Sequence, residues 1–592
     1  MRWTVPTVRK GKSSLADVDL TIKIAGEAGQ GLQAVGGLLS RLFARKGYHV
    51  FANQVVQSRV RGGHNWFAIR ISDRPVHSPS FQTDILVALD QESSCHLKEL
   101  RKDSVVIFDS RQTAFSAGRG RMLDAPMAEL ASKAGGNKLM INTVAASLVL
   151  GFLNFDPEDL FAFLRQSFGK KDQETGEVNV RVARAGYDFA HTLDLGAKIA
   201  DFSRPAGKPK MLVGGSDAVA LGALAAGCQF ISAYPMSPST GIMTYLASKA
   251  DPCHIVVEQS EDEIASINMA LGASFAGVRA MTASSGGGFA LMVEGLSLAG
   301  MIETPIVIVL AQRPAPATGL PTRTAQEDLL FAVHAGHGEF PRAVIAPKDI
   351  EGCFYATARA FNLADKYRIP VIILTDQLLA DSFATIDALH PEEAVLRRYL
   401  MTEDELKQAR DHKSFLLTKS GVSPRALPGN PYCFVTADSD EHDEYGRITE
   451  DLDRMRPRMV EKRNRKTRGL MKELKPPSWH GPGNAKEVLV GWGSTYGALK
   501  EAVDTLCADG VSIALAHFED LWPLDRKHFG FLNKKRPAVV VENNFTGQFA
   551  DLIARTTGIV MDRRISRYDG LPFTAGEIVR AYKELRKKGG RR

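Results

Sequence analysis

The chain has 592 residues and a formal net charge of +7, and 44% of its residues are hydrophobic and 24% charged. A chain of this length forms roughly three or four domains, and its composition is that of an ordinary globular protein. The basic runs, Arg454–Arg468 and Lys583–Arg592, have neither interleaved aromatic residues nor zinc-finger spacing. They therefore argue against a nucleic-acid-binding protein, and we expect each to form a solvated face or a subunit contact.

The cysteines and the apolar stretches exclude further classes. No two of the six cysteines are spaced as Cys-x-x-Cys, so we expect no iron–sulfur cluster and no structural metal in this chain. Scattered cysteines are typical of a reducing compartment, and residues 1–18 lack the apolar core of a signal peptide. The most apolar stretch, Ala290–Ala311, is interrupted by Glu294, Glu303 and Pro305. We therefore expect a cytoplasmic protein that neither spans nor binds a membrane.

The first predicted α/β unit begins with a glycine-rich connection. A strand over Asp19–Ala25 runs into Gly26-Glu-Ala-Gly29-Gln-Gly31, and a helix over Leu32–Lys46 follows. Backbone N–H groups converge at such a helix start and can cradle a phosphate. A glycine turn that merely connects strand to helix fits the pattern equally well.

A second glycine-rich segment, Gln57-Ser-Arg-Val-Arg-Gly-Gly63, carries Arg59 and Arg61. Two guanidinium groups on a glycine loop suit a polyanionic ligand. Strands and helices then alternate: strands over Asp84–Leu89 and Ser104–Phe108, and helices over Asn142–Gly151 and Pro157–Phe168. This alternation predicts an α/β domain.

The second predicted unit opens with a strand over Lys210–Val213 and a helix rich in small residues. Its next strand, Phe230–Ala233, leads into Tyr234-Pro-Met-Ser-Pro-Ser-Thr240. The two prolines exclude a helix within this loop. Capping of the following helix would explain Ser239 or Thr240, whereas Ser237 precedes the second proline and is free to face a ligand.

The segment Ile255–Arg313 has the strand–helix–strand–helix–strand order of a doubly wound sheet, which binds ligands beyond its strand ends. Glu263 opens the first helix, where a carboxylate is poorly placed for core packing and well placed to reach a ligand. The alternative is that it stabilises the helix amino end, a role for which Glu261 or Asp262 is better placed. The loop Thr282–Gly288 follows the second strand.

The third strand, Ile306–Ala311, delivers Gln312 and Arg313 at its carboxyl end, and three prolines follow before Thr322. A surface turn rarely combines three prolines with an arginine at a strand end, so we predict an anion-binding loop. The pattern beyond it predicts a helix over Thr324–His334 and strands over Ala343–Ala346 and Val371–Thr375.

Residues 402–480 are charged and rich in helix breakers, which predicts a linker. Its acidic segment, Asp438–Glu450, is dense in possible hard-metal ligands, but the spacing matches no ion-binding loop. We expect it to pack across domains. A third α/β unit follows, with strands over Lys486–Gly491, Val511–His517 and Ala538–Glu542, a helix that begins at Trp492 and ends at Cys507, and a helix opened by Asn543–Gln548.

Four motifs, in this order, carry a family resemblance: Tyr-Pro-Met-Ser-Pro-Ser-Thr (234–240), Glu-Asp-Glu-Ile-Ala-Ser-Ile-Asn-Met-Ala (261–270), Thr-Ala-Ser-Ser-Gly-Gly-Gly (282–288) and Gln-Arg-x-x-Pro-x-Thr-Gly-Leu-Pro-Thr (312–322). Together they resemble the α subunit of the 2-oxoacid:ferredoxin oxidoreductases, which are thiamine-diphosphate enzymes. The resemblance implies three doubly wound α/β domains: a γ domain (18–200) fused ahead of α and associated with coenzyme A, a pyrimidine-binding domain (209–395), and a transketolase C-terminal-like domain (485–592), with a linker or insertion at 396–480.

The resemblance also implies roles for single residues. Glu263 corresponds to the glutamate that bonds the aminopyrimidine ring and favours the imino tautomer, which removes the C2 proton. Ser237, Arg313 and Thr322 would hold the carboxylate of a 2-oxo acid, with Arg313 supplying the matching fork. The implied cofactor-binding residues are Tyr234, Pro235 and Glu263 for thiamine diphosphate, and Gly26, Gly29, Gly31, Arg59 and Arg61 for coenzyme A.

This chain departs from the family at two positions of the first motif. The family usually has isoleucine where this chain has Met236, and threonine where it has Ser237. Serine keeps the hydroxyl but lacks the methyl group that fixes the rotamer, so a looser or differently shaped substrate pocket is expected.

The sequence has no Gly-Asp-Gly motif of the kind that holds Mg²⁺ and the diphosphate of thiamine in related enzymes. The resemblance therefore implies a β subunit that holds both, together with at least one [4Fe-4S] cluster. It also implies an (αβ)₂ heterotetramer with ferredoxin as the electron acceptor. The implied reaction is the reversible conversion of a 2-oxo acid and coenzyme A into acyl-CoA, carbon dioxide and reduced ferredoxin.

The fusion of γ to α and the stretch Leu-Pro-Thr-Arg-Thr-Ala-Gln-Glu-Asp-Leu (320–329) look most like the 2-oxoglutarate enzymes. A dicarboxylate needs a second cation, for which Arg323 is the candidate; the alternative is an ion pair of Arg323 with Glu327 at i+4. Two other classes stay open: a pyruvate or branched-chain 2-oxo acid enzyme, and a non-catalytic α/β protein that binds nucleotides at Gly26–Gly31.

Overall fold

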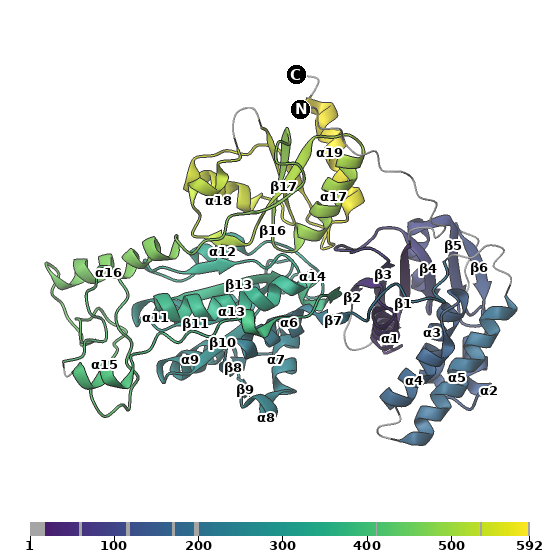
Figure 1. Cartoon of the computed structure of the whole chain (residues 1–592), viewed down its shortest axis with the longest axis horizontal. Helices are drawn as coiled ribbons and strands as arrows, with labels where there is room; N and C mark the ends of the chain where they lie inside the picture. Colours follow the sequence, from purple (N-terminus) through teal and green to yellow (C-terminus); the bar gives the residue numbers. More distant parts are fainter. Residues whose placement is uncertain are drawn as a thin grey trace, which may run out of the picture.

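The computed structural model describes residues 18–57, 62–113, 119–168, 172–193, 200–409, 411–532 and 536–589. The chain forms three α/β units, which Figure 1 shows at the right in purple and blue, at the left in teal and green, and at the top in yellow-green. They are built on sheets of eight, seven and five strands. The predicted α/β class is confirmed.

The first sheet has the strand order β6-β5-β4-β1-β3-β2-β14-β7. The elements of the first unit are β1 (Asp19–Ala28), α1 (Leu32–Arg45), β2 (His49–Val55), β3 (Gly62–Ser72), β4 (Thr83–Ala88), η1 (Gln91–Glu99), β5 (Leu100–Phe108), β6 (Arg121–Asp124), α2 (Met127–Lys133), η2 (Lys138–Met140), α3 (Ile141–Phe152), α4 (Pro157–Phe168) and α5 (Gln173–Thr192). β1, β4, β5 and β6 run parallel, whereas β3 is antiparallel to both β1 and β2. This sheet is therefore mixed.

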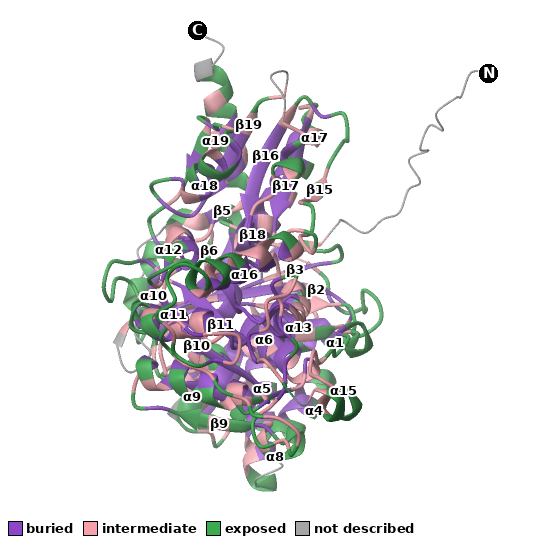
Figure 2. Cartoon of the chain, turned by 90° about the vertical axis from the view of Figure 1, so that its left-hand side faces the viewer, coloured by how far each residue is buried: buried purple, intermediate pink, exposed green. Residues whose placement is uncertain are grey.

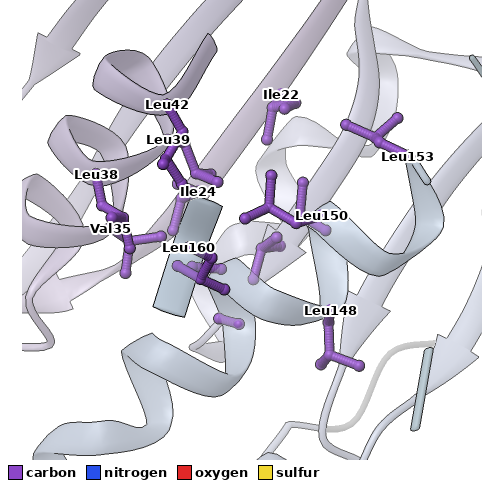
Figure 3. Packing of buried hydrophobic residues seen from close by; sticks show 14 of the residues in the cluster. Ile22, Ile24, Val35, Leu38, Leu39, Leu42, Leu148, Leu150, Leu153 and Leu160 are labelled. Atoms are coloured by element: carbon purple, nitrogen blue, oxygen red, sulfur yellow. The ribbon is translucent and has the colours of Figure 1, made fainter. Parts of the chain in front are cut away.

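The core of the first unit explains why these residues form a strand and a covering helix. Leu38 and Leu42 lie four residues apart on α1, so they share the helix face that packs on the sheet. Figure 3 shows this face beside Ile22 and Ile24 of β1, with Leu150 of α3 nearby. Full burial of each such side chain contributes about 1.5–3 kcal/mol to stability.

The second unit contains β7 (Met211–Gly214), α6 (Gly215–Ala225), β8 (Cys228–Ala233), α7 (Thr240–Ala247), α8 (Ala250–Cys253), β9 (Val256–Gln259), α9 (Glu263–Phe275), β10 (Arg279–Ser284), α10 (Gly286–Leu291), α11 (Val293–Met301), β11 (Ile306–Gln312), α12 (Leu329–His334), β12 (Ala343–Ile345), α13 (Ile350–Tyr367), β13 (Pro370–Asp376), α14 (Gln377–Asp381) and β14 (Phe383–Ile386). Its sheet has the order β18-β12-β13-β11-β10-β8-β9. Figure 2 shows buried strands at the centre, covered by helices with exposed outer faces.

The strand order reverses at β8 of this second sheet. The chain passes from β8 to β9 on one side and then returns to β10 on the other, and both neighbours are parallel to β8. The loops at the carboxyl ends of β8 and β10 therefore flank a topological switch point, where open α/β sheets bind their ligands. Two of the sequence motifs, residues 234–240 and 282–288, meet at this place.

Strands cross between the units. β7, predicted to open the second unit, pairs with β14, and β14 pairs antiparallel with β2 of the first unit. The first sheet therefore continues into the second unit through backbone hydrogen bonds.

The third unit is a five-stranded sheet of order β15-β17-β16-β19-β20. It contains β15 (Ser478–His480), β16 (Glu487–Trp492), η4 (Gly493–Thr495), α17 (Tyr496–Ala508), β17 (Ile513–Phe518), β18 (Asp520–Trp522), η5 (Arg526–Phe529), β19 (Ala538–Glu542), α18 (Gln548–Thr557), β20 (Arg564–Ser566) and α19 (Ala575–Gly589). β18 leaves this unit to pair antiparallel with β12 of the second sheet.

The predicted helix over Thr324–His334 is wrong in its first half, because only Leu329–His334 is helical. The preceding residues dock on the third unit instead. Gln326 N donates to Asn543 O at 2.8 Å, Gln326 Nε2 donates to Trp492 O at 2.9 Å, and Asn543 N donates back to Gln326 Oε1 at 3.0 Å. These bonds between units replace the bonds that a helix would make.

The linker holds η3 (Pro391–Glu393), α15 (Glu403–Gln408) and α16 (Met455–Leu470). The expectation that the basic run Arg454–Arg468 forms a solvated face or a subunit contact is wrong for its inner side. Lys462 and Lys466 are buried and both contact the carboxylate of Glu303. The acidic segment Asp438–Glu450 also contacts this helix, since Glu441 forms an ion pair with Arg463 of α16. Across the described ranges, no helix is long and apolar enough to cross a membrane.

Candidate active site

The loops that follow β8, β10 and β11 contact one another at the switch point. Arg313, which follows β11, donates from Nη1 to the carbonyl oxygen of Ser237, in the loop after β8, at 2.7 Å. Ser284, the last residue of β10, lies 3.8 Å from the sulfur of Met236. Residues 234–240, 282–288 and 312–322, three of the four family motifs, thus form one wall of the candidate site at the carboxyl edge of the sheet.

Glu263 is buried at this edge, with 2% of its surface exposed, as the first residue of α9. It is not the residue that caps the helix, because Asp262 accepts the hydrogen bond of Ala265 N at 2.7 Å. Glu263 Oε1 instead accepts a hydrogen bond from Ser284 Oγ at 3.1 Å. The carboxylate of Glu263 therefore faces the loop after β10 and is oriented by it.

The glycines of that loop allow two carboxylates to approach its backbone. A Cβ atom at Gly288 would lie 2.3 Å from Glu263 Oε1, and one at Gly286 would lie 2.7 Å from Asp328 Oδ2. Any side chain at either position would displace a carboxylate. Gly286 and Gly288 thus allow Glu263 and Asp328 to lie against the amino end of α10.

Several polar atoms around this loop are buried without a hydrogen-bond partner among the described residues: Thr282 Oγ1, Ser285 Oγ and Asp328 Oδ2. Such atoms cost free energy unless a ligand or water satisfies them. Burial raises the pKa of Asp328 to about 6, with Glu327 adding to the rise and Arg313 opposing it. This combination of orphaned polar groups and a shifted carboxyl group is typical of a functional site.

Arg313 and the loop Tyr234–Thr240 differ in how far they are exposed at this edge of the sheet. Arg313 is partly buried, and burial lowers the pKa of its guanidinium, which Asp328 partly restores. Ser239 directly precedes α7, but its hydroxyl donates to Met236 O at 2.8 Å and makes no cap bond, so capping does not explain it. Tyr234 is 40% exposed at the start of the same loop, and a partner molecule can reach its ring.

Thr322 and Arg323 lie at the boundary between the first and second units. The hydroxyl of Thr322 donates to the carbonyl of Val56, which follows β2. Arg323 stacks over Trp66 of β3, with its Cζ atom 5.3 Å from the ring centroid. Among the described residues Arg323 forms no ion pair with Glu327, whose Oε2 accepts from Ala315 N at 2.9 Å. Arg323 Nη1 is buried and has no hydrogen-bond partner in the described ranges.

The glycine-rich connection of the first unit borders a separate cavity of about 270 Å³. The cavity lies at the carboxyl ends of β1, β4 and β5, and its lining includes Gly29, Gln30, Asp109, Gln112 and Asn142. Gly31 directly precedes α1 and has φ 69°, a conformation that favours glycine. Gly26 lies within β1, paired with Asn65. Arg59 and Arg61 lie outside the described residues.

Two protein-family models together match most of the chain. Residues 21–189 match the family described as pyruvate ferredoxin/flavodoxin oxidoreductase, and residues 221–462 match pyruvate flavodoxin/ferredoxin oxidoreductase, thiamine diP-bdg. The 2-oxoacid:ferredoxin oxidoreductase subunit alpha of Saccharolobus solfataricus is 32% identical over 96% of this chain and 98% of its own length. This chain belongs to the 2-oxoacid:ferredoxin oxidoreductase α subunits.

Two further relatives of this α subunit act on a named substrate. The 2-oxoglutarate oxidoreductase subunit KorA of Mycobacterium tuberculosis is 28% identical over 95% of this chain and 91% of its own length. The solved 2-oxoglutarate:ferredoxin oxidoreductase of Magnetococcus marinus, with 2-oxoglutarate, coenzyme A and succinyl-CoA bound, superposes with a TM-score of 0.89. It is 32% identical and covers 96% of this chain and 99% of that one. The resemblance inferred from the motifs is confirmed.

Sequence reasoning missed three residues of this α subunit that the fold brings to the site. Ser284 stood inside a recognised motif, but nothing in the motif singled it out as the partner of Glu263. Asp328 lay in a segment predicted as helix, where an acidic residue carries no signal. Trp66 belongs to another unit, and its contact with Arg323 depends on how the units pack.

Proposed function

We propose that this α subunit, together with a β subunit, catalyses the reversible oxidative decarboxylation of 2-oxoglutarate with coenzyme A to succinyl-CoA, carbon dioxide and reduced ferredoxin. The observation that carries the choice of substrate is Arg323, a partly buried side chain with a buried and orphaned Nη1, one residue beyond Thr322 on the loop of Arg313. The test of the reaction is reduction of a viologen dye by the assembled enzyme, with 2-oxoglutarate and with pyruvate.

The residues at the switch point fit the ring of thiamine diphosphate. Bound there, the cofactor would supply a nucleophilic carbon for the keto group of the substrate and an acceptor for the electron pair left by decarboxylation. Glu263 would hold a proton in a hydrogen bond to the aminopyrimidine ring, and Ser284 would keep its carboxylate in place. The orphaned hydroxyls of Thr282 and Ser285 offer further hydrogen bonds to a polar ring.

The remaining residues would hold the substrate. Arg313 is already fixed by its bond to Ser237 O and keeps other N–H groups for the carboxylate that is lost as carbon dioxide. Arg323 would bind the distal carboxylate of 2-oxoglutarate. The cavity beside Gly29 and Asp109 would receive coenzyme A, at the edge of the sheet where α/β folds bind nucleotides.

We predict that Arg323→Ala raises the KM for 2-oxoglutarate by about 10- to 100-fold. A hydrogen bond to a charged group contributes about 1.5–3 kcal/mol, and 1.4 kcal/mol is tenfold in affinity. Dye-reduction kinetics should show little change in the KM for pyruvate, which has no distal carboxylate. Arg323→Lys keeps the charge without the planar fork of arginine, so its KM for 2-oxoglutarate should fall between those of the wild type and Arg323→Ala. Equal effects of Arg323→Ala on both substrates would remove Arg323 from this role.

We also predict that the purified chain binds thiamine diphosphate weakly on its own, because no Gly-Asp-Gly motif supplies a metal site for the diphosphate. A β subunit would supply that site, and with it the [4Fe-4S] cluster and the contact with ferredoxin in an (αβ)₂ assembly. Isothermal titration with Mg²⁺ present should show tight binding only after the partner is added. Tight binding by the chain alone would contradict the division of the site between subunits.

The proposal includes a cytoplasmic location. All six cysteines are free thiols in the structure, and free thiols are typical of a reducing compartment.

A further inference from the structure

A cluster of two histidines and a cysteine lies in the first unit, away from the wall around Glu263. His64 is on β3, and Cys95 and His96 are in η1. One ligand atom from each of the three residues lies within 4.8 Å of the others. The two imidazoles are buried and Cys95 is exposed. The Nε2 atoms of the two rings are 2.9 Å apart.

The other nitrogen of each ring faces a carboxylate. His64 Nδ1 lies 3.2 Å from Asp90 Oδ2, and His96 Nδ1 lies 2.8 Å from Glu99 Oε1. A carboxylate accepts hydrogen bonds and donates none, so each Nδ1 carries the proton. Lys23 Nζ also lies 3.5 Å from His96 Nδ1, but Lys23 donates to Glu99, and the shorter contact of Nδ1 with Glu99 sets the tautomer. In their neutral forms both rings then direct the lone pair of Nε2 at the other ring. Two lone pairs at 2.9 Å repel unless a proton or a metal ion lies between them.

The carboxylates are themselves held in place, as the outer partners of metal-binding histidines usually are. Asp90 Oδ1 accepts from Ser93 N at 2.8 Å and from Ser93 Oγ at 2.6 Å. Glu99 forms an ion pair with the buried Lys23. The orientation of both rings is thus fixed by the first unit rather than by chance contacts at its surface.

A shared proton would leave a positively charged histidine pair that attracts the Cys95 thiolate, whereas a metal ion would satisfy both imidazole lone pairs and the thiolate at once. We propose that His64, Cys95 and His96 bind a divalent transition-metal ion, with Zn²⁺ as the best match to two imidazoles and one thiolate. Zinc takes nitrogen ligands at about 2.0–2.1 Å and sulfur at about 2.3 Å, with three protein ligands leaving a fourth position open. In a tetrahedral site the two nitrogens would stand about 3.3 Å apart, which requires only a small separation of the rings.

The spacing of these ligands explains why the sequence did not reveal the site, and why we expected no metal in this chain. Cys95 and His96 are adjacent, but His64 lies on a different strand, and no Cys-x-x-Cys or His-x-x-x-His pattern results. The exposed Cys95 offers an entry path from solvent.

The ion would also fix the support of Arg323. Trp66 lies between the cluster and the second unit, with its ring centroid 4.9 Å from that of His96 and 5.9 Å from that of His64. The guanidinium of Arg323 stacks on the same indole. The metal would therefore hold the imidazoles on which this stack rests. The metal site itself does not depend on the substrate proposed above.

The test is a titration of the untagged full-length chain with Co²⁺, which replaces zinc and reports its ligands by absorption. We expect one ion per chain, with a thiolate-to-cobalt charge-transfer band and the d–d bands of a tetrahedral site. Cys95→Ser should remove the charge-transfer band. Cys253→Ser, which changes another exposed cysteine, should leave it unchanged. Added Zn²⁺ should displace the cobalt and raise the melting temperature of the wild type more than that of Cys95→Ser.

Two results would overturn the proposal. One is the absence of a charge-transfer band in the wild-type chain, which would leave a hydrogen-bonded histidine pair only. The other is a band of equal intensity in Cys95→Ser. Because Cys95 is exposed, its replacement should not prevent folding, and circular dichroism of the metal-free variant checks this. His96→Ala provides a second variant, which should lose the d–d bands as well.

Discussion

The Glu263→Gln variant of the assembled enzyme should lose about 10²- to 10⁴-fold in kcat, the usual contribution of a positioned proton-transfer group. Glutamine has nearly the same shape and can still accept the bond from Ser284, so the fold should be kept. It cannot hold the proton that a carboxyl group exchanges with an aminopyrimidine ring. Viologen reduction at saturating 2-oxoglutarate, coenzyme A and thiamine diphosphate measures the loss.

Glu261→Gln is the matched control for this variant. Glu261 lies two residues earlier and is exposed, so the same change of chemistry should leave kcat within about twofold, as for most surface substitutions. Thermal melting of both variants separates a loss of chemistry from a loss of folded protein. A Glu263→Gln enzyme with wild-type turnover would show that this carboxylate does not act on the cofactor.

The alternation of strands and helices and the meeting of the motifs at one sheet edge were predictable because they depend on local pattern. Apolar runs that end in Tyr234–Thr240, Thr282–Gly288 and Arg313 mark the carboxyl ends of parallel strands, and such ends share one edge of a sheet. The position of Glu263 at the start of a helix followed from the same reasoning. The family resemblance added chemical roles that periodicity alone could not give.

The contacts between units could not be predicted in this way. Nothing near Arg323 indicates that it would stack on Trp66, more than 250 residues earlier in the chain. The bonds of Gln326 to the third unit likewise replaced a helix that the local sequence favours. Long-range packing decides such segments, since it supplies hydrogen bonds that compete with those of a helix.

The basic helix α16 shows the same limit most clearly. Its composition predicts a solvated face, yet Lys462 and Lys466 each bring Nζ to 2.6 Å from an oxygen of Glu303, and all three side chains are at most 1% exposed. The contact of Lys466 is an ion pair whose angles fall outside a hydrogen bond. Glu303, within the apolar stretch 290–311, is the counter-charge that allows these two lysines to be buried, because buried ammonium groups need one.

Replacing Glu303 by glutamine should therefore destabilise the protein by about 3–5 kcal/mol, since removing one partner leaves buried charge without compensation. Burial alone would raise the pKa of Glu303, but Lys466, Lys462 and Arg368 outweigh it and hold the pKa far below its usual value. Burial lowers the pKa of Lys466 to about 7 even with the carboxylate present. Without it, Lys466 must fold as the neutral amine.

Because Lys466 must fold as the neutral amine, the free energy of unfolding of Glu303→Gln depends on pH. The unfolded lysine binds its proton up to about pH 10.5 and the folded one does not, so stability rises with pH wherever the unfolded state holds more protons. In the folded wild type Lys466 gains its proton below about pH 7, so the deficit of Glu303→Gln, measured by urea unfolding, should be larger at about pH 5.5 than at about pH 8 and level off above about pH 7. A deficit that stays constant or shrinks as the pH falls over this range would show that Lys466 keeps its proton in the folded variant.

Two further variants isolate the buried charge. Glu461→Gln on the same helix changes a carboxylate that is 70% exposed and should alter stability by less than about 0.5 kcal/mol. Glu303→Gln combined with Lys462→Met and Lys466→Met removes the unpaired charges along with the carboxylate. It should recover most of the lost stability, because apolar side chains of similar length replace a buried ion cluster at little cost. If this triple variant were as unstable as Glu303→Gln, the loss would come from packing and not from charge.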